Sequence, residues 1–235
     1  MSTPARRQGP PSSSSRDTTR PVPVPAVLRD GTAILLRPIE PGDKWRLQAA
    51  LRLLSERSRY RRFFSPIKEL SPEQLRRLTE VDWVDHVAWV AGLPDAQRHP
   101  GIGVARYVRL KDEPEVAEAA ITVIDDFQNR GLGHVLLHRL AHSAIAGGIR
   151  QLRAYVLAEN RAMLVLLREL GVTESSYEAG LVRVDVELPA SEAELDASAA
   201  RKLLRMAASG ELDFRSPMVS ARGFEPPRPF RGTRS

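Results

Sequence analysis

The alternation of apolar and polar residues predicts a body of short strands and amphipathic helices between residues 32 and 188. Six segments have the length and the apolar pattern that are typical of β-strands, and Gly, Pro or Asp residues separate them. The expected strands are residues 32–39, 86–92, 101–110, 115–124, 150–157 and 180–188. Four other segments have helical spacing. The expected helices are residues 43–58, 71–81, 133–145 and 160–170.

Several of these helices carry capping residues at their ends. Ser71, Pro72 and Gln74 have the spacing of a capping box with proline at the first helical position. Asp43 stands where a negative charge favours the first turn of a helix, and Gly171 follows the last residue of another helix. The order of strands and helices indicates a mixed α/β fold.

Composition divides the chain of 235 residues into four segments. Residues 1–28 and 210–235 are rich in Pro, Ser and Arg and have few apolar residues, so we expect disordered tails. Residues 29–190 contain enough apolar residues for one globular domain of ordinary size. Residues 191–209 are expected to form one amphipathic helix that docks either on this domain or on a partner.

The net charge of +6 comes mostly from the two ends, which carry +3 in residues 1–28 and +2 in residues 209–235. The body is nearly neutral, which argues against nucleic-acid binding as the main role. The chain has no cysteine, so disulfides, thiolate zinc sites and cysteine nucleophiles are excluded. It has neither an apolar run of roughly 20 residues nor the apolar core of a secretory signal, so we expect a cytoplasmic protein without a membrane span.

The stretch "QNRGLG", residues 128–133, lies between an expected strand and an expected helix and has the spacing Q-x-x-G-x-G. The first N–H groups of a helix lack partners within the helix and favour an anion, and glycine lets a pyrophosphate approach the backbone. A dinucleotide-binding fingerprint would need a third glycine where Leu136 stands, and a P-loop would need a lysine. A glycine turn that only caps the helix is the alternative explanation.

The order of elements together with this loop resembles the GNAT family of acyl-CoA-dependent N-acyltransferases over residues 33–189. Three stretches are similar to the acetyltransferase domain of bacterial Pat-type protein lysine acetyltransferases. They are "SRYRRFFSPIKELSPEQLRRLTEVD", "AEAAITVIDDFQNRGLG" and "LAENRAMLVLLRELG". The resemblance implies a mixed, mostly antiparallel sheet flanked by helices, with a bulge in the fourth strand that splays it from the fifth.

The same resemblance implies that acetyl-CoA binds in the gap between those two strands. The backbones of Ile121 and Val123 are expected to bind the pantetheine arm and the thioester. The glycine loop is expected to hold the phosphates. Its binding residues are Gln128, Asn129, Arg130, Gly131, Leu132, Gly133 and His134. Asn160 is expected to reach the cofactor arm, although it is equally suited to cap the helix that it precedes.

Acetyl transfer to an amine requires a proton acceptor more than a proton donor. A lysine amine has a pKa near ~10.4, so forming its neutral state at pH 7 costs roughly 4–5 kcal/mol, whereas a thiol with a pKa near ~8.5 leaves as thiolate for about 2 kcal/mol. Glu118 matches the glutamate that serves as base in Pat-type enzymes. The alternative explanation of Glu118 is a solvated carboxylate at the start of a strand. The tyrosine that serves as acid in many family members is replaced by Leu167.

Two other clusters have simpler explanations than a binding site. His134, His138 and His142 recur at helical spacing, but no acidic ligand accompanies them, and no metal is expected. The arginines within residues 57–62 are typical of a solvated helix end. In the resembled fold they border the acceptor entrance, where they attract an acidic protein surface.

We therefore expect an enzyme that transfers an acetyl group from acetyl-CoA to a primary amine. The resemblance favours lysine side chains of proteins as acceptors, with acyl-CoA synthetases among the candidate partners. Acetylation of a small amine is one alternative. The other is a non-catalytic acyl-CoA-binding module with a regulatory role.

Overall fold

The structure is a computed structural model that describes residues 21–94, 100–171, 173–178 and 180–208. The chain divides into two compact units, Met1–Leu195 and Asp196–Ser235. All the predicted site residues belong to the first unit.

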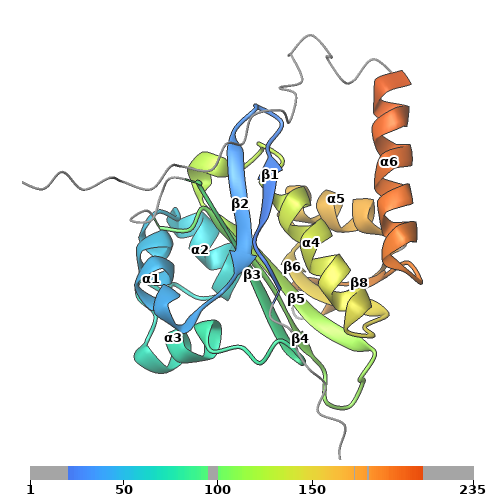
Figure 1. Ribbon diagram of the computed structural model, residues 1–235. Helices are drawn as coiled ribbons and strands as arrows, with labels where there is room; N and C mark the ends of the chain where they lie inside the picture. Colours follow the sequence, from blue (N-terminus) through green and yellow to red (C-terminus); the bar gives the residue numbers. More distant parts are fainter. Residues whose placement is uncertain (1–20, 95–99, 172, 179, 209–235) are drawn as a thin grey trace, which may run out of the picture. The chain divides into compact units, whose positions relative to one another are not determined.

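Within the described residues of the first unit, eight strands form one mixed sheet in the order β1-β2-β3-β4-β5-β6-β8-β7 (Figure 1). Neighbouring strands are antiparallel except β5 and β6, which are parallel. The strands are β1 (Val24–Val27), β2 (Ala33–Pro38), β3 (His86–Gly92), β4 (Gly103–Arg109), β5 (Val116–Val123), β6 (Gln151–Leu157), β7 (Thr173–Glu178) and β8 (Leu181–Glu187). The expected fold class, a mixed and mostly antiparallel sheet flanked by helices, is confirmed.

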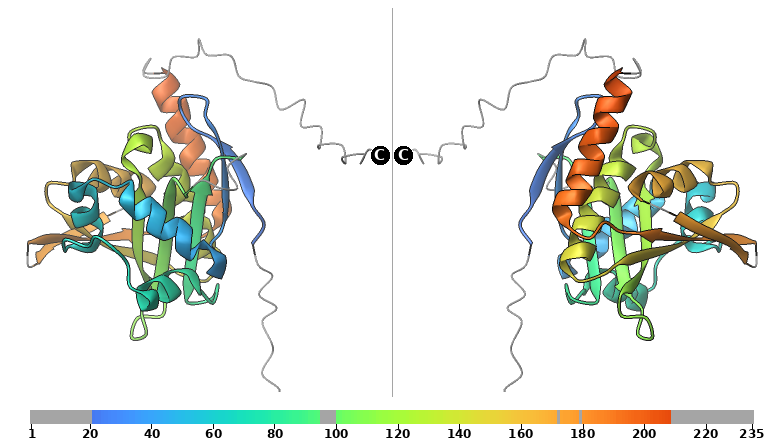
Figure 2. Two further views of the ribbon diagram at one scale, coloured as in Figure 1. Left: turned by 90° about the vertical axis from the view of Figure 1, so that its left-hand side faces the viewer. Right: turned by 90° about the vertical axis from the view of Figure 1, so that its right-hand side faces the viewer.

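Helices cover both faces of this sheet. Figure 1 and Figure 2 show α1, α2 and α3 on one face, and α4 and α5 on the other. The helices are η1 (Pro41–Asp43), α1 (Lys44–Arg52), α2 (Glu56–Phe63), α3 (Pro72–Thr79), η2 (Asp125–Phe127), α4 (Leu132–Ala146), α5 (Arg161–Leu170) and α6 (Glu192–Ala208). In the part of the chain that is described, no helix is long and apolar enough to cross a membrane. The start of α6 belongs to the first unit, where Leu195 is buried in the core.

Two strands were not expected from the sequence, and both lie at the edges of the sheet. β1 occupies residues 24–27. The prediction of a disordered tail over residues 1–28 is therefore wrong for these four residues. Pro25 is compatible with β1 because an edge strand has one side without ladder hydrogen bonds. β7 reads "TESSYE" and lacks an apolar alternation. The remaining expected tail residues, 1–20 and 210–235, lie outside the described residues.

The helix expected over residues 43–58 is divided into α1 and α2. The break occurs at Ser55, whose side chain accepts a hydrogen bond from the N–H of Ser58 at 3.2 Å and thereby starts α2. The N–H of Ser55 donates to Asp125 at 3.1 Å. Since Asp125 lies 70 residues further along the chain, the local sequence pattern does not reveal this contact.

The predicted capping box of α3 is confirmed. The side chain of Ser71 accepts from the N–H of Gln74 at 3.1 Å, and the side chain of Gln74 accepts from the N–H of Ser71 at 2.8 Å. Both interactions join residues three positions apart, so they follow from the local sequence alone.

The apolar face of α4 packs against β3, β4 and β5. Leu136 and Leu140 of this helix are fully buried, and burying one such side chain contributes about 1.5–3 kcal/mol. Trp89 of β3 is also fully buried and donates its indole N–H to the Oγ atom of Ser143 at 2.9 Å. These contacts fix α4 across the centre of the sheet.

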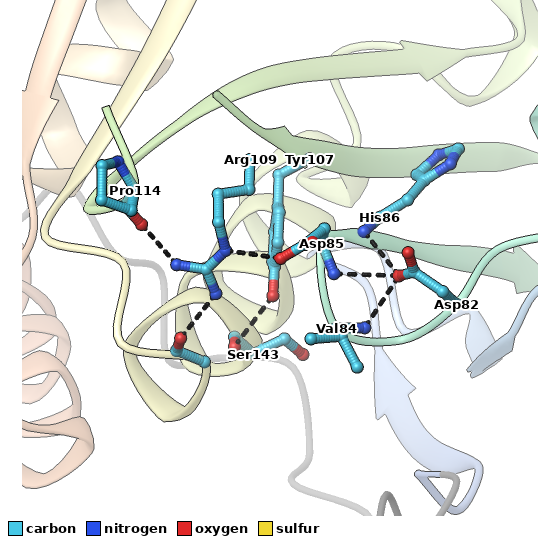
Figure 3. Close-up of polar contacts among 9 residues, drawn as sticks. Asp82, Val84, Asp85, His86, Tyr107, Arg109, Pro114 and Ser143 are labelled. Carbon is cyan, nitrogen blue, oxygen red and sulfur yellow. Dashed lines mark hydrogen bonds and ion pairs between the residues drawn. The ribbon is translucent and has the colours of Figure 1, made fainter. Parts of the chain in front are cut away.

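Polar contacts fix the C-terminal end of α4 to one end of the sheet (Figure 3). Arg109 of β4 donates from Nη2 to the carbonyl oxygen of Gly147, just after α4, at 2.8 Å. It also donates from Nε to Asp85 at 2.8 Å and from Nη1 to the carbonyl oxygen of Pro114. Asp82 organises the turn beside it by accepting the N–H groups of Val84, Asp85 and His86. The N-terminal end of α4 is thereby directed to the opposite end of the sheet.

Candidate active site

β5 and β6 are joined only over a short stretch. Their pairing begins at Val116 and Gln151 and ends at Glu118 and Arg153, and no further pair forms in the described part of either strand. Because both strands continue beyond this point, the sheet opens between them. The splay expected between these two strands is therefore present.

The opening does not arise from a bulge in β5. From Ala117 to Val123 each residue of β5 pairs with one residue of β4, without an extra residue in either strand. The bulge implied by the family resemblance is thus absent from this stretch, and that part of the prediction is wrong. β6 pairs with β8 along its whole length, from Gln151 to Leu157, so beyond Arg153 it stays in the sheet through β8 alone.

The space between the separating strands is a cleft of about 360 Å³. Its walls come from β5, β6, α2, α5 and the loop that precedes α4. Most of the predicted site residues line it. They are Glu118, Ile121, Val123, Gln128, Asn129, Gly131, Gly133, His134 and Asn160. Arg130 and Leu132 are not among its lining residues.

Backbone groups of β5 face this cleft. The N–H of Ile124 donates to the carbonyl oxygen of Ile102 beside β4, so even-numbered residues of β5 have their backbone groups directed toward β4. Because these groups alternate in direction along a strand, those of Ile121 and Val123 are directed toward β6, from which β5 has separated. The side-chain amide of Gln128 donates a hydrogen bond to the carbonyl oxygen of Val123 at 3.1 Å. The N–H of Val123 and both backbone groups of Ile121 are left facing the cleft.

The loop before α4 adopts a shape that exposes backbone N–H groups. Asn129 and Gly131 have φ angles of 60° and 88°, in the left-handed region that glycine adopts freely. Gly131 occupies the N-cap of α4, where it has no side chain to bond the first turn. Within the described residues, the N–H groups of Leu132 and Gly133 have no hydrogen-bond acceptor. This helix end is therefore suited to an anion.

Two predicted residues of this loop have their side chains engaged in holding its shape. The Nε2 group of Gln128 donates to Val123 and also to Asp125 Oδ1 at 3.0 Å. Leu132 is 1% exposed and belongs to the hydrophobic core. The Nε2 group of Gln128 also lies 3.2 Å from Ser58 Oγ, so a ligand would meet the backbone of these two loop residues rather than their side chains.

Arg130 is also held by the protein itself. Its guanidinium pairs with Asp30 and donates to Thr32 Oγ1 at 2.7 Å. It also lies over the ring of Phe127, with 4.4 Å from Cζ to the ring centroid. The side-chain hydrogen bond from Arg130 lowers the pKa of Asp30 to about 2. Arg130 thus fastens the turn between β1 and β2 to the glycine loop.

A second arginine, which the sequence analysis missed, lies over the glycine loop. The N–H of Arg29, in the turn between β1 and β2, donates to the carbonyl oxygen of Arg130 at 3.3 Å. A Cβ atom built on Gly131 would lie 3.1 Å from Cγ of Arg29, so the Arg29 side chain crosses directly over this glycine. Arg29 is exposed and lines the cleft. No local pattern marks it, because only pairing of β1 with β2 brings its turn to the loop.

His134 and Asn160 mark the side of the cleft formed by α5. His134 forms a hydrogen bond with Glu169 of α5 through Nε2. Asn160 precedes α5, but its side chain makes no capping hydrogen bond. The alternative explanation of Asn160 as a helix cap is therefore not realised, and its amide is left at the cleft wall.

Glu118 stands at the apex of the cleft, where the pairing of β5 with β6 ends. Its side chain is exposed, and none of the described residues forms an ion pair with it. The nearby positive charge belongs to Arg62 of α2, which also lines the cleft. Burial lowers the pKa of the Arg62 guanidinium, and the charge of Glu118 opposes this shift.

The cleft contains a phenol that the sequence analysis overlooked. Leu167 is 2% exposed, so this part of α5 supplies only an apolar wall. Tyr155 of β6 also lines the cleft. Glu118 pairs with Arg153, and Tyr155 is two residues further along β6, so the side chains of Glu118 and Tyr155 point to the same face of the sheet. The alternation of polar and apolar residues in "QLRAYVL" already indicated that Arg153 and Tyr155 share a face.

The histidines of α4 take part in separate side-chain contacts. The rings of His138 and His142 meet edge to face, with 4.8 Å between their centroids. Nδ1 of His142 lies 2.8 Å from a carboxylate oxygen of Glu192. His134 is engaged with α5 instead. The absence of a metal stays a prediction.

Comparison with known proteins gives a family match over the part of the chain that contains the cleft. The family described as acetyltransferase (GNAT) domain matches residues 33–173. Acetyltransferase Pat of Mycolicibacterium smegmatis is 36% identical over 167 residues, which are 71% of this chain and 49% of that protein. Acetyltransferase PA5475 of Pseudomonas aeruginosa is 35% identical over 144 residues, which are 61% of this chain and 77% of that protein. The chain thus spans about half the length of the first of these relatives.

A solved structure agrees with this match. The crystal structure of the GNAT domain of S. lividans PAT is similar to this chain with a TM-score of 0.65 and 34% sequence identity. The similarity covers 71% of this chain and 97% of that domain. It therefore includes nearly all of that domain.

Proposed function

The chain belongs to the acetyltransferase (GNAT) family, and from this membership we propose that it transfers an acetyl group from acetyl-CoA to the side-chain amine of protein lysine residues. The relatives that carry the names Pat and PAT support a Pat-type role for this chain. The observation that carries the proposal is the cleft between β5 and β6. It has open backbone groups at one wall, a helix N-terminus at one end and a free carboxylate at the other.

The cofactor is proposed to lie along this cleft with its phosphates at α4. The N–H groups of Leu132 and Gly133 would donate to the pyrophosphate, and the positive end of the helix dipole would favour its charge. The pantetheine amides would bond to the open backbone groups of Ile121 and Val123, as an added strand bonds to a sheet edge. Asn160 would hold the arm from the opposite wall.

Arg29 is proposed to supply the positive charge that the sequence assigned to Arg130. Arg130 is engaged with Asp30 and Thr32, whereas the exposed side chain of Arg29 lies over Gly131. A guanidinium there would form charge-assisted hydrogen bonds with a phosphate of the coenzyme.

Glu118 is proposed to act as the base that accepts the proton of the attacking amine. The acceptor amine must lose a proton before it attacks the thioester carbon, and forming that neutral amine at pH 7 costs roughly 4–5 kcal/mol. A carboxylate at the apex of the cleft can take this proton directly or through one water. As the amine attacks, the C–N bond forms, the C–S bond breaks and the thiolate leaves. Tyr155, which also lines the cleft, is the proposed donor of a hydrogen bond to the developing thiolate.

Acetyl-CoA binding and turnover with an acceptor panel test this proposal. The panel contains an acyl-CoA synthetase, lysine peptides and small primary amines, and acetylation is read by mass spectrometry. We expect binding of acetyl-CoA and turnover that is fastest with protein lysines. Turnover confined to small amines would favour the first alternative, and binding without any turnover would favour the regulatory module. Absence of acetyl-CoA binding would contradict all three.

A further inference from the structure

A second cavity lies on the face of the sheet that α1, α2 and α3 cover, and its volume is about 60 Å³. Its walls are mostly apolar. They include Leu47, Leu51 and Leu78 from the helices and Val90 and Val104 from the sheet. On the same measure one water needs about 10–15 Å³, so this space holds a group of only a few heavy atoms.

Besides Arg46, which pairs with Asp43 at 3.1 Å, two arginines line this apolar cavity. Arg106 of β4 is 6% exposed. Its Nη1 group donates to the carbonyl oxygen of Leu78 at 3.1 Å and lies 3.2 Å from Nε2 of His86. Burial lowers the pKa of His86 to about 4, so this partner is neutral. Arg62 of α2 is the second arginine in the lining.

Neither arginine forms an ion pair with an acidic residue among the described residues, although the charge of Glu118 acts on Arg62 from the adjoining cleft. Asp43, the carboxylate in the cavity lining, is committed elsewhere, because it pairs with Arg37 at 2.6 Å and with Arg46 at 3.1 Å. Burial, together with the charges of Arg62 and Arg77, lowers the pKa of Arg106 to about 9. A buried charge without a counter-charge is unfavourable, so this end of the cavity attracts an anion from outside the chain.

The cavity adjoins the cleft on the side of Glu118. Arg62 and Thr122 line both spaces. Glu118 pairs with Val108 of β4, and Arg106 is two residues from Val108 on the same face. Diagonal neighbours of this kind have their Cβ atoms roughly 7–8 Å apart. A group held by the two arginines would therefore lie within one or two residues of an amine at Glu118.

We propose that the cavity between Arg62 and Arg106 binds a carboxylate of the acceptor, namely an acidic side chain that lies within two residues of the acceptor lysine. This inference rests on the proposed function. Planar guanidinium groups match a carboxylate geometrically, and the apolar walls accommodate the methylene groups of a glutamate. The enzyme would then select lysines by their acidic neighbours.

Matched peptides test this selection. Each pair contains one lysine and either Glu or Gln at one of the two positions before or after it. We expect kcat/KM of the wild type to be about 10- to 100-fold higher for the Glu member of at least one pair, which is the range expected for hydrogen bonds to a buried charged group. In Arg62→Gln this ratio should fall to about one, and Arg62→Lys should restore part of it.

Arg52→Gln is the matched control, because Arg52 is an exposed arginine of α1 that lines neither space. It should keep the wild-type ratio. Thermal unfolding and acetyl-CoA binding of Arg62→Gln establish that the variant is folded. Equal rates for Glu and Gln peptides in the wild type, or a preference that survives in Arg62→Gln, would overturn the inference.

If peptides are not acetylated but small amines are, protein acceptors are ruled out and the proposed function fails. The carboxylate site is then tested with 6-aminohexanoate and hexylamine, which differ by one carboxylate. A preference for 6-aminohexanoate that Arg62→Gln removes would support the carboxylate site on its own. Equal rates would contradict it.

Discussion

Glu118 of β5 and Arg153 of β6 form the last residue pair that joins these two strands, yet their charged groups do not pair with each other. Arg153 donates from Nε to Asp185 at 2.8 Å and from Nη1 to Glu113 at 2.7 Å. These two carboxylates satisfy the guanidinium. Among the described residues Glu118 therefore forms no ion pair at the apex of the cleft, which suits its proposed role as base.

Replacement of Glu118 by glutamine tests its role as base. Glutamine keeps the shape of the side chain but cannot accept the proton, so we expect turnover to fall by about 10²- to 10⁴-fold while acetyl-CoA affinity stays near the wild-type value. The rate of the variant should keep rising with pH toward the pKa of the amine. Glu115→Gln is the control, since Glu115 is exposed and does not line the cleft. Activity within a few-fold of wild type in Glu118→Gln would exclude Glu118 as the base.

A comparison of two arginine variants tests the phosphate site. Arg29→Ala should weaken acetyl-CoA binding by about tenfold, because it removes a charge-assisted hydrogen bond at an exposed position. Arg130→Ala should mainly lower the melting temperature, because Arg130 holds Asp30 and Thr32. Calorimetry with coenzyme A and with dephospho-coenzyme A identifies the phosphate concerned. A loss of affinity confined to coenzyme A indicates the 3′-phosphate, and an equal loss indicates the pyrophosphate. Unchanged affinity in Arg29→Ala would remove Arg29 from the site.

Substitution of Gly133 tests the close approach of a ligand to the start of α4. A Cβ atom at Gly133 would lie 3.1 Å from Cδ2 of Leu166, so Gly133→Val should disturb the packing of α4 on α5 as well as the phosphate path. We expect weaker acetyl-CoA binding and a lower melting temperature. Adding Leu166→Ala relieves the contact, so binding that stays weak in the double variant would assign the effect to the ligand. Recovery of wild-type affinity would assign it to packing.

The stability of the protein should decrease as the pH falls from 6.5 to 4. Burial, and then the charge of Arg106, lower the pKa of His86 from 6.5 to about 4. Between these values the unfolded chain binds a proton at His86 that the folded protein does not, so the stabilisation is complete above pH 6.5 and is lost toward pH 4. In His86→Gln the amide oxygen can still accept a hydrogen bond from Arg106. The melting temperature of this variant should therefore change less between pH 6.5 and pH 4 than that of the wild type. Parallel curves for the two proteins would contradict this assignment.

Much of the fold could be predicted because it depends on local sequence. The capping box at Ser71 and the glycine loop at residues 128–133 join residues only a few positions apart, so their patterns are visible in the chain. The buried face of α4 follows from helical spacing in the same way. The edge strands β1 and β7 lack such a pattern in the sequence, and only their backbone pairing with β2 and β8 identifies them.

The direction of individual side chains was decided only by the tertiary structure. Sequence alone placed Arg130 at the phosphates, but Asp30 and Thr32, about one hundred residues earlier, draw its guanidinium away and leave Arg29 over the loop. The opening beyond Glu118 depends on the divergence of β6 from β5, while β6 stays paired with β8 along its whole length. Arg62 and Arg106, which form no ion pair with the described residues, line one cavity because α2 packs on β5 from a distant part of the chain. Such contacts join residues that are far apart in the sequence and depend on packing across the sheet. A local sequence pattern therefore does not predict them.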